Sequence, residues 1–322
     1  MTAEAAPAPR PAPDRSPGLR LLFALEAGRA AVFGRMPKSL TPYVFLLPAA
    51  LLIGLLVAGM AYMVDQSFRE LDRATFRLAE EWSLGNYATI LDRLVYWKII
   101  GRTVLAAVVV TAGALVLALP YAYAMVRTDS ARVRKALLIG LFLPFFIGQV
   151  VRAYGWLIVL GNQGLVNATL GAVGIEPVKI IYTYPAVLIG LVQYMLPFAV
   201  LMLAPAVTAI PREVELASQS LGARWPSTLR HVILPMAKPG LVAAGVVVFT
   251  LTITDFAMPE IMGGGSNDFI ASAIYDGFFA VADAGLGSAL AVILVMLASL
   301  LVGVIFSLVG VGTLGYRQRR AA

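Results

Sequence analysis

The chain has 322 residues, 60% of them hydrophobic and 13% charged, and its mean hydropathy is +0.84. Soluble globular domains carry about 25% charged residues, so this composition excludes an ordinary soluble enzyme. The sequence has no cysteine, which excludes disulfides, thiolate metal sites and a cysteine nucleophile. The formal net charge of +7 implies no nucleic-acid partner, because an apolar chain places Lys and Arg in loops beside a membrane.

Residues 1–38 are predicted to form a disordered cytoplasmic tail. The first twenty residues include five prolines and no apolar run, so they cannot bury enough surface to offset the entropy of the free chain. No apolar stretch of signal-peptide length precedes Pro37, and we therefore expect no cleaved leader in this segment.

Six stretches are apolar over about 20 residues, the length that a helix needs to cross a bilayer. Prolines interrupt several of them, which membrane helices tolerate where neighbouring helices satisfy the freed carbonyls. The sequence therefore predicts an all-α membrane protein in which six helices form a packed bundle over residues 39–315. The predicted spans are residues 43–64, 103–126, 136–160, 185–210, 239–262 and 286–315.

The connections between the spans predict the orientation of the chain. Lys and Arg gather in the N-terminal tail, in residues 127–135, in the connection 211–238 and after residue 316, whereas most acidic residues lie in the other connections. Positive residues accumulate on the cytosolic side of a membrane. Both termini are therefore predicted to be cytoplasmic, with residues 316–322 as a short tail.

The connection 211–238 is too long for a simple turn between two spans. Pro211 suits the first position of a helix, two glutamates favour the helix N-terminus just after it, and Gly222 supplies the left-handed residue that commonly ends helices. The pattern predicts one short helix over residues 211–221 and a second over residues 226–235.

Apolar side chains within this connection allow two arrangements. If they face the cytosol, they form a docking surface for a partner. If the connection folds back, they are buried against the helix bundle. The helix pattern alone leaves both arrangements open for Val214, Leu216, Leu221 and Trp225.

The sequence ELASQSLGA at residues 215–223, followed by VILP at 232–235, resembles the EAA loop in the membrane subunits of ATP-binding-cassette (ABC) importers. In that family a Glu-Ala-Ala triplet shortly precedes a glycine, and an Ile-x-Leu-Pro-like element ends thirteen residues after that glycine, a spacing that Gly222 and Pro235 keep. The triplet aligns with residues 216–218, so Leu216 takes the place of the glutamate and Glu215 lies one residue earlier. The resemblance implies a coupling helix that inserts into a groove of an ATP-hydrolysing subunit, with Glu215, Leu216, Ala217, Ser218, Leu221, Gly222, Trp225 and Pro235 as coupling residues.

The segments PFF at 144–146 with VRAYGW at 151–156, GLVQYMLPF at 190–198 and EIMGGG at 260–265 extend the resemblance, in particular to spermidine/putrescine-type permeases. It covers most of residues 43–310. It implies the six-helix transmembrane domain of a type I ABC importer in the bacterial inner membrane. The implied partners are ABC ATPase subunits, a second permease subunit in a homo- or heterodimer, the lipid bilayer, and a periplasmic or extracellular substrate-binding protein.

The resemblance implies that this chain performs no catalysis and binds no cofactor, and that ATP and Mg belong to the partner ATPase. The sequence contains no G-x-x-x-x-G-K-[ST] phosphate loop. The predicted solute is a polyamine or a related cationic amine, with aminoethylphosphonate or iron as alternatives. A different class, a self-sufficient secondary transporter or channel, predicts an inverted repeat that the sequence does not show, and it leaves the connection 211–238 without a role.

Ionisable side chains at membrane depth are costly and usually face a pore, a cavity or a partner charge. Arg152 lies in the third predicted span, and Asp255 and Glu260 lie in or near the fifth. The two acids either line a path for a cationic solute, with aromatic rings facing its ammonium group, or one of them pairs with Arg152 to hold two helices together.

Polar and aromatic neighbours complete the predicted path. Three threonines at positions 250, 252 and 254 either line it or bond back to their own helix. His231 is the only histidine, so no metal site is predicted. The path candidates are Arg152, Tyr154, Gln193, Tyr194, Thr254, Asp255 and Glu260.

Overall fold

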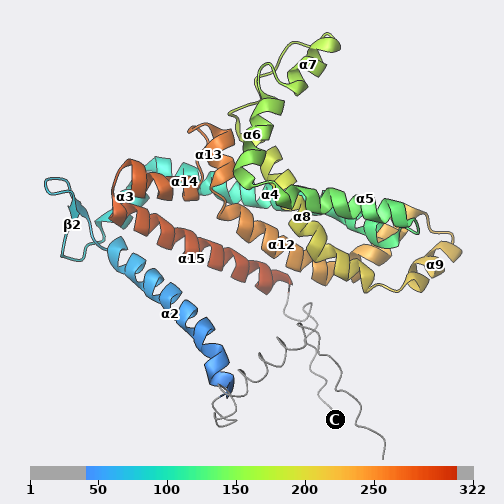
Figure 1. Cartoon of the computed structure of the whole chain (residues 1–322), viewed down its shortest axis with the longest axis horizontal. Helices are drawn as coiled ribbons and strands as arrows, with labels where there is room; N and C mark the ends of the chain where they lie inside the picture. The colour runs from blue at the N-terminus through green and yellow to red at the C-terminus, as the bar shows by residue number, and fades with distance from the viewer. Residues whose placement is uncertain (1–40, 310–322) are drawn as a thin grey trace, which may run out of the picture. The chain divides into compact units, whose positions relative to one another are not determined.

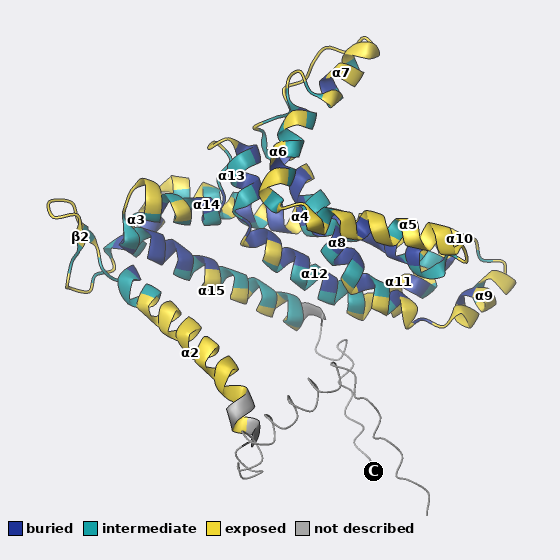
Figure 2. Cartoon of the chain, in the orientation of Figure 1, coloured by how far each residue is buried: buried dark blue, intermediate teal, exposed yellow. Residues whose placement is uncertain are grey.

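The computed structural model describes residues 41–309, and the chain divides into two units, residues 1–62 and 63–322. The predicted tails over residues 1–38 and 316–322 lie outside the described residues. Helix α2 (Thr41–Ser67) begins in the first unit, and its residues 46–62 are all exposed (Figure 2).

Strand structure within residues 41–309 is limited to one small hairpin. In it, β1 (Leu71–Asp72) pairs antiparallel with β2 (Arg77–Leu78). The hairpin is followed by α3 (Gly85–Asp92), which packs against the last long helix, α15 (Ala284–Val309).

Three helices supply most of the core of the second unit: α4 (Leu94–Arg127), α8 (Tyr184–Thr208) and α12 (Lys238–Ile253). They lie side by side (Figure 1). On α4, buried residues recur at positions 106, 110, 114, 118 and 122, and all but one are alanine. On α8, buried residues also recur every four positions from 187 to 207. Such rows form ridges that fit the grooves of a neighbouring helix, and the small side chains bring the backbones close together.

The third predicted span is not one straight helix. Helix α5 (Ala131–Phe142) continues as the 3-10 turn η1 (Leu143–Phe146), and the chain then bends by 103° before α6 (Gln149–Leu160). Pro144 and Gly148 lie at the bend, where proline lacks a donor and glycine relaxes the backbone. Helix α7 (Leu165–Ala172) follows α6.

The fifth predicted span is also interrupted. Helix α12 ends at Ile253, and α13 (Ala257–Gly263) begins after a three-residue break. Helix α14 (Ile270–Tyr275) and the π-helical turn η3 (Asp276–Ala280) then lead into α15.

By length and composition, four helices within residues 41–309 can cross a membrane: segments of α2 and α15, and the whole of α4 and α8. Two bent helix pairs raise the number to as many as six. One pair is formed by the helices on either side of the 103° bend. The other joins residues 225–236 to α12 at an angle of 74°.

Candidate functional site

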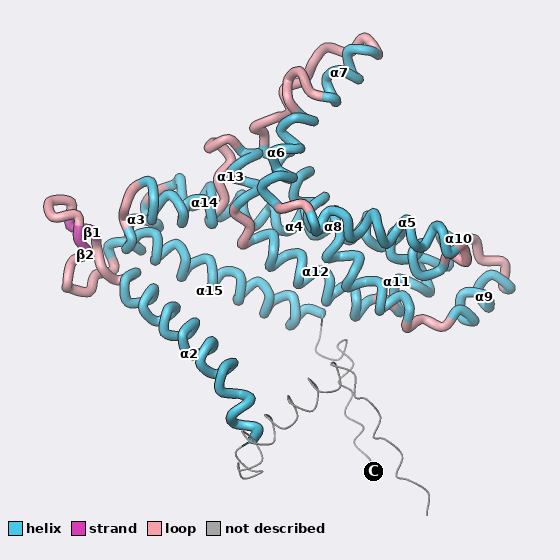
Figure 3. The backbone as a smooth tube through the Cα atoms, in the orientation of Figure 1, coloured by secondary structure: helices cyan, strands magenta, loops and turns pink. Residues whose placement is uncertain are grey.

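The connection between α8 and α12 contains the predicted short helices. Helix α9 (Arg212–Ser220) ends before Gly222, whose φ of +81° is in the left-handed region, as the sequence predicts. The Ala223 N–H closes the turn by donating to the Ser218 carbonyl at 3.2 Å. Helix α10 (Trp225–Thr228) then continues through the π-helical turn η2 (Leu229–Ile233) into α11 (Leu234–Met236). Figure 3 shows α9 as a separate short helix between two loop segments.

Helix α9 and the turn after it expose an apolar surface, which we call the α9 face: Val214, Leu216, Leu221 and Trp225. Leu216 is 53% exposed, Leu221 is 89% exposed and Trp225 is 46% exposed. Ala217 and Pro235 are also exposed, whereas Ser218 is half-buried and its hydroxyl lies 3.0 Å from that of Thr228. Of the two arrangements that the sequence allows, Val214, Leu216 and Leu221 adopt the one accessible to a partner. The Trp225 ring is partly exposed but also packs against Tyr123 of the bundle.

Glu215 points away from the α9 face and into the protein. Its side chain is buried and accepts hydrogen bonds from the Tyr123 hydroxyl and from Arg127 Nε, both at 2.8 Å. Both donors lie at the end of α4. The acid next to the family's usual glutamate position therefore binds within its own chain.

A second ion pair joins the start of α9 to the loop after α4. Arg212 Nη1 lies 3.0 Å from Asp129 Oδ1, and both side chains are largely exposed. The hydrogen bonds from Arg212 lower the pKa of the Asp129 carboxyl, and the same bonds raise the pKa of Arg212. Because water screens exposed pairs, this contact contributes little to stability.

A second candidate site lies where the two broken helices meet. Asp255, in the break between α12 and α13, is buried and accepts a hydrogen bond from Gln149 Nε2, at the start of α6, at 2.6 Å. Its other carboxylate oxygen accepts from the Met258 N–H at 3.0 Å and so caps α13. Both of these donors are neutral, so neither compensates the carboxylate charge.

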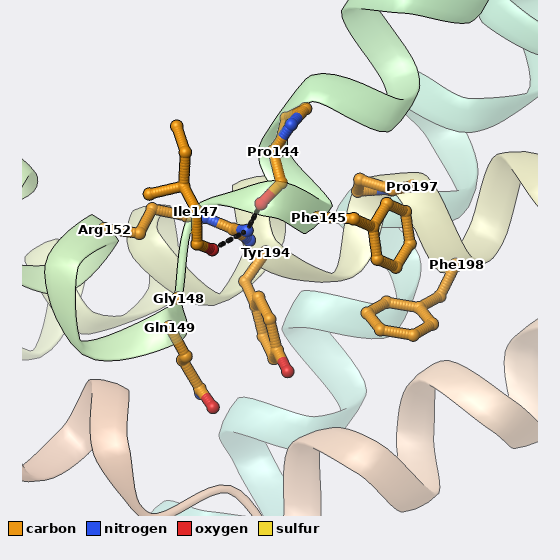
Figure 4. A pocket seen from close by; sticks show the side chains of 9 residues that line it. All are labelled: Pro144, Phe145, Ile147, Gly148, Gln149, Arg152, Tyr194, Pro197 and Phe198. Atoms are coloured by element: carbon orange, nitrogen blue, oxygen red, sulfur yellow. Dashed lines mark hydrogen bonds between the residues drawn. The ribbon is translucent and has the colours of Figure 1, made fainter.

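Arg152 does not form the predicted ion pair with Asp255 or Glu260 within the described residues. It donates instead to the carbonyls of Pro144 and Ile147, which lie at the helix bend. The Pro144 carbonyl also accepts from the Ile147 N–H at 3.2 Å. Its guanidinium carbon lies 5.2 Å from the centre of the Tyr194 ring. These groups line a cavity of about 130 Å³ (Figure 4), together with Phe145, Gly148, Gln149, Pro197 and Phe198.

The other path candidates are dispersed around this junction. The Trp156 indole N–H donates to Gln193 Oε1 at 3.3 Å. Tyr154 is exposed, and Glu260 is half-buried on α13. Thr250 and Thr252 bond back to their own helix, α12, and Thr254 Oγ1, just after the end of α12, donates to the Thr250 carbonyl at 2.9 Å. This is one of the two arrangements that the sequence allows.

Residues 130–310 match the family described as binding-protein-dependent transport system inner membrane component. This chain belongs to that family. The permease is 30% identical over 272 residues to the inner membrane ABC transporter permease protein YdcU of Escherichia coli K12, covering 80% of this chain and 86% of that protein. It is also 30% identical to the spermidine/putrescine transport system permease protein PotB of the same organism, covering 74% and 86%.

Solved structures show the same fold. A chain of the bacterial alginate ABC transporter in complex with an alginate pentasaccharide-bound periplasmic protein matches with a TM-score of 0.70 at 16% identity, covering 85% of the permease and 96% of that chain. A chain of the MetNI methionine ABC transporter matches with a TM-score of 0.50 at 21% identity, covering 66% and 93%. The predicted family, the type I ABC importer fold and the inner-membrane location are thus confirmed.

Several residues at the two sites were missed by reasoning from the sequence. In the sequence, Arg127 is only one of several positive charges predicted to be cytosolic. Tyr123 precedes it by one helical turn and shares its face of α4. No sequence pattern singles out Gln149, because it reaches Asp255 only where the two broken helices come together. Within residues 41–309, no group of three His, Asp or Glu side chains is placed to hold a metal ion.

Proposed function

We propose that this permease is the non-catalytic translocation subunit of an ATP-driven importer for a small polar solute. Separate ATPase subunits bind ATP and Mg, a second permease subunit completes the pathway, and an external binding protein delivers the solute. Both termini lie in the cytosol, as does the connection that contains α9. The positively charged residues around that connection support this orientation.

The observation that carries this proposal is the α9 face. Burying one leucine side chain contributes about 1.5–3 kcal/mol, so an exposed cluster next to the charged cytosolic loops favours a protein partner. The ATPase subunits are the partners that the EAA-like spacing predicts for this position. ATP binding and hydrolysis would move α9, and each nucleotide state would stabilise one of two packings of the helix bundle.

Replacing Leu221 by Asp tests this docking. The substitution puts a charge where an apolar contact is expected, and we expect at least about a tenfold loss of co-purified ATPase from detergent-solubilised membranes. Gln219→Asp is the matched control, because Gln219 is also exposed on α9 but does not belong to the α9 face. Equal loss of ATPase in both variants, or full retention in Leu221→Asp, would exclude the α9 face as the docking surface.

We further propose a small cationic amine of the polyamine type as the solute. The similarity to PotB supports this class. The buried Asp255 carboxylate, whose described hydrogen-bond partners are neutral, supplies a negative charge where two broken helices meet. The nearby Tyr194 ring already packs against one cation, the Arg152 guanidinium, whose central carbon lies 5.2 Å from the ring centre.

An Asp255→Asn permease should import putrescine poorly. The amide keeps the size of the side chain and an acceptor for the Met258 N–H, so mainly the charge is lost. We expect uptake at low putrescine concentration to fall about tenfold or more, since losing one partner of a buried charge pair costs about 2–5 kcal/mol. ATPase co-purification should not change. Equal putrescine uptake by variant and parent would show that Asp255 is structural and would favour a solute of another class.

A further inference from the structure

The cytosolic end of α4 holds the coupling connection through a buried ionic contact. Arg127 Nε and Nη2 lie 2.8 Å and 2.5 Å from Glu215 Oε1, and the Tyr123 hydroxyl donates to Oε2 at 2.8 Å. The side chains of Arg127 and Glu215 are 15% and 5% exposed. Both carboxylate oxygens of Glu215 are therefore bound by α4, and water screens this pair far less than a surface pair.

Arg127 also binds the end of α8. Its Nη2 donates to the carbonyl of Ile210 at 2.7 Å and to that of Val207 at 3.3 Å. The last carbonyls of a helix lack partners within the helix and carry partial negative charge, so a guanidinium group stabilises them. One side chain of α4 thus connects the end of α8 to the coupling helix.

Aromatic and apolar contacts reinforce this connection. The Trp225 ring, at the start of α10, packs edge-on against Tyr123 with 5.8 Å between ring centres. Beneath them, Ile210, Ile233 and Ala237 form a buried cluster against which Tyr123 packs. Both short helices that flank Gly222 therefore contact α4, a helix distant from them in sequence.

We propose that Glu215, Arg127 and Tyr123 form a clamp that transmits the displacement of α9 into α4. This inference rests on the proposed coupling of α9 to an ATPase. Along the polypeptide backbone, α9 is connected directly to α8 and, through α10 and α11, to α12. The clamp adds α4, which packs along both of these helices, so that the three core helices move with α9. Glu215 is therefore a positioning residue within the permease.

The chemistry of the clamp makes it stiff. Removing one partner of a buried ion pair leaves an uncompensated charge, which is costly, so the helices cannot separate here without a large penalty. The exposed Arg212–Asp129 pair spans the same region but has no such penalty. Neutralising one member of the clamp is therefore expected to impair coupling, whereas neutralising one member of the surface pair is not.

The test uses the complete importer in proteoliposomes and measures solute imported per ATP hydrolysed. In Glu215→Gln and in Arg127→Gln, ATPase subunits should remain bound and hydrolysis should continue, while the ratio falls at least about tenfold. The double variant should be no worse than either single variant, because both changes break the same contact. Glu213→Gln and Asp129→Asn, both exposed, are matched controls and should keep the parental ratio.

A distance measurement separates transmission from simple stability. Because the sequence has no cysteine, spin labels can be placed at Glu213 on α9 and at Ala124 on α4 without removing native thiols. We expect one narrow distance distribution with and without ATP in the parent, and a broad one in Glu215→Gln. Any of three results would overturn the clamp. The first is parental coupling in both single variants, and the second is a double variant whose loss of coupling equals the product of the two single losses. The third is an unchanged distance distribution in Glu215→Gln. Failure of the parental permease to bind an ATPase would instead overturn the proposed function.

Discussion

A Gly222→Val permease should insert and fold but lose most of its coupling to the ATPase. Gly222 has a φ of +81°, and a Cβ placed there would meet no heavy atom within 4 Å. The penalty is therefore conformational. An ordinary residue in the left-handed region costs about 1–2 kcal/mol, and a β-branched residue costs more. The turn between α9 and α10 would then adopt another conformation in most molecules, which displaces Leu221 and Trp225.

Gly222→Asn is the control for this prediction. Asparagine enters the left-handed region more readily than valine, so it should keep most of the ATP-driven uptake and co-purified ATPase. We expect Gly222→Val to lose both by about tenfold or more, with membrane insertion and thermal unfolding of the bundle unchanged. Parental uptake in Gly222→Val would show that this turn has no part in coupling.

A Gly240→Ala permease should be impaired in folding, because the substitution disturbs the packing of the helix bundle. Gly240 is near the start of α12, where an added Cβ would lie 2.2 Å from the Cβ of Ala206 on α8. Neither group is at the end of a flexible side chain, so the two helices that flank the connection must move apart. Overpacking of this kind costs about 1–3 kcal/mol or more. We expect a lower yield of folded permease and a lower Tm in detergent.

A second substitution should relieve this steric clash. Ala206→Gly removes the opposing methyl group, so the double variant Gly240→Ala/Ala206→Gly should recover the yield and most of the lost Tm. The measurement is a thermal melt of all four proteins in the same detergent. If Ala206→Gly does not restore Gly240→Ala, the close crossing of α8 and α12 at this point is not the cause of the defect.

Local sequence signals predicted the coupling connection well. Gly222 ends α9 as expected, because the left-handed conformation is a property of the residue and its immediate neighbours. The direction of Glu215 was not predictable in the same way. It depends on Tyr123 and Arg127, which lie about ninety residues earlier and reach α9 only after α4 and α8 have packed together.

The helix breaks could not be located from the sequence for a different reason. Proline does not distinguish a break from a continuous helix here, since Pro120 lies within α4 and Pro197 and Pro205 lie within α8. Near Pro144 the chain does bend, and the bend places the carbonyls of Pro144 and Ile147 where Arg152 binds them. A sequence shows the charge of Arg152 but not these carbonyl acceptors, and it therefore suggested an acidic partner instead.

The central claim is that a separate ATPase drives this permease through α9. The most direct measurement is solute uptake by proteoliposomes that contain the permease pair and the binding protein, with the ATPase subunits supplied or withheld. We predict uptake only when the ATPase subunits and ATP are both present. Equal uptake in vesicles that lack the ATPase subunits would contradict the account.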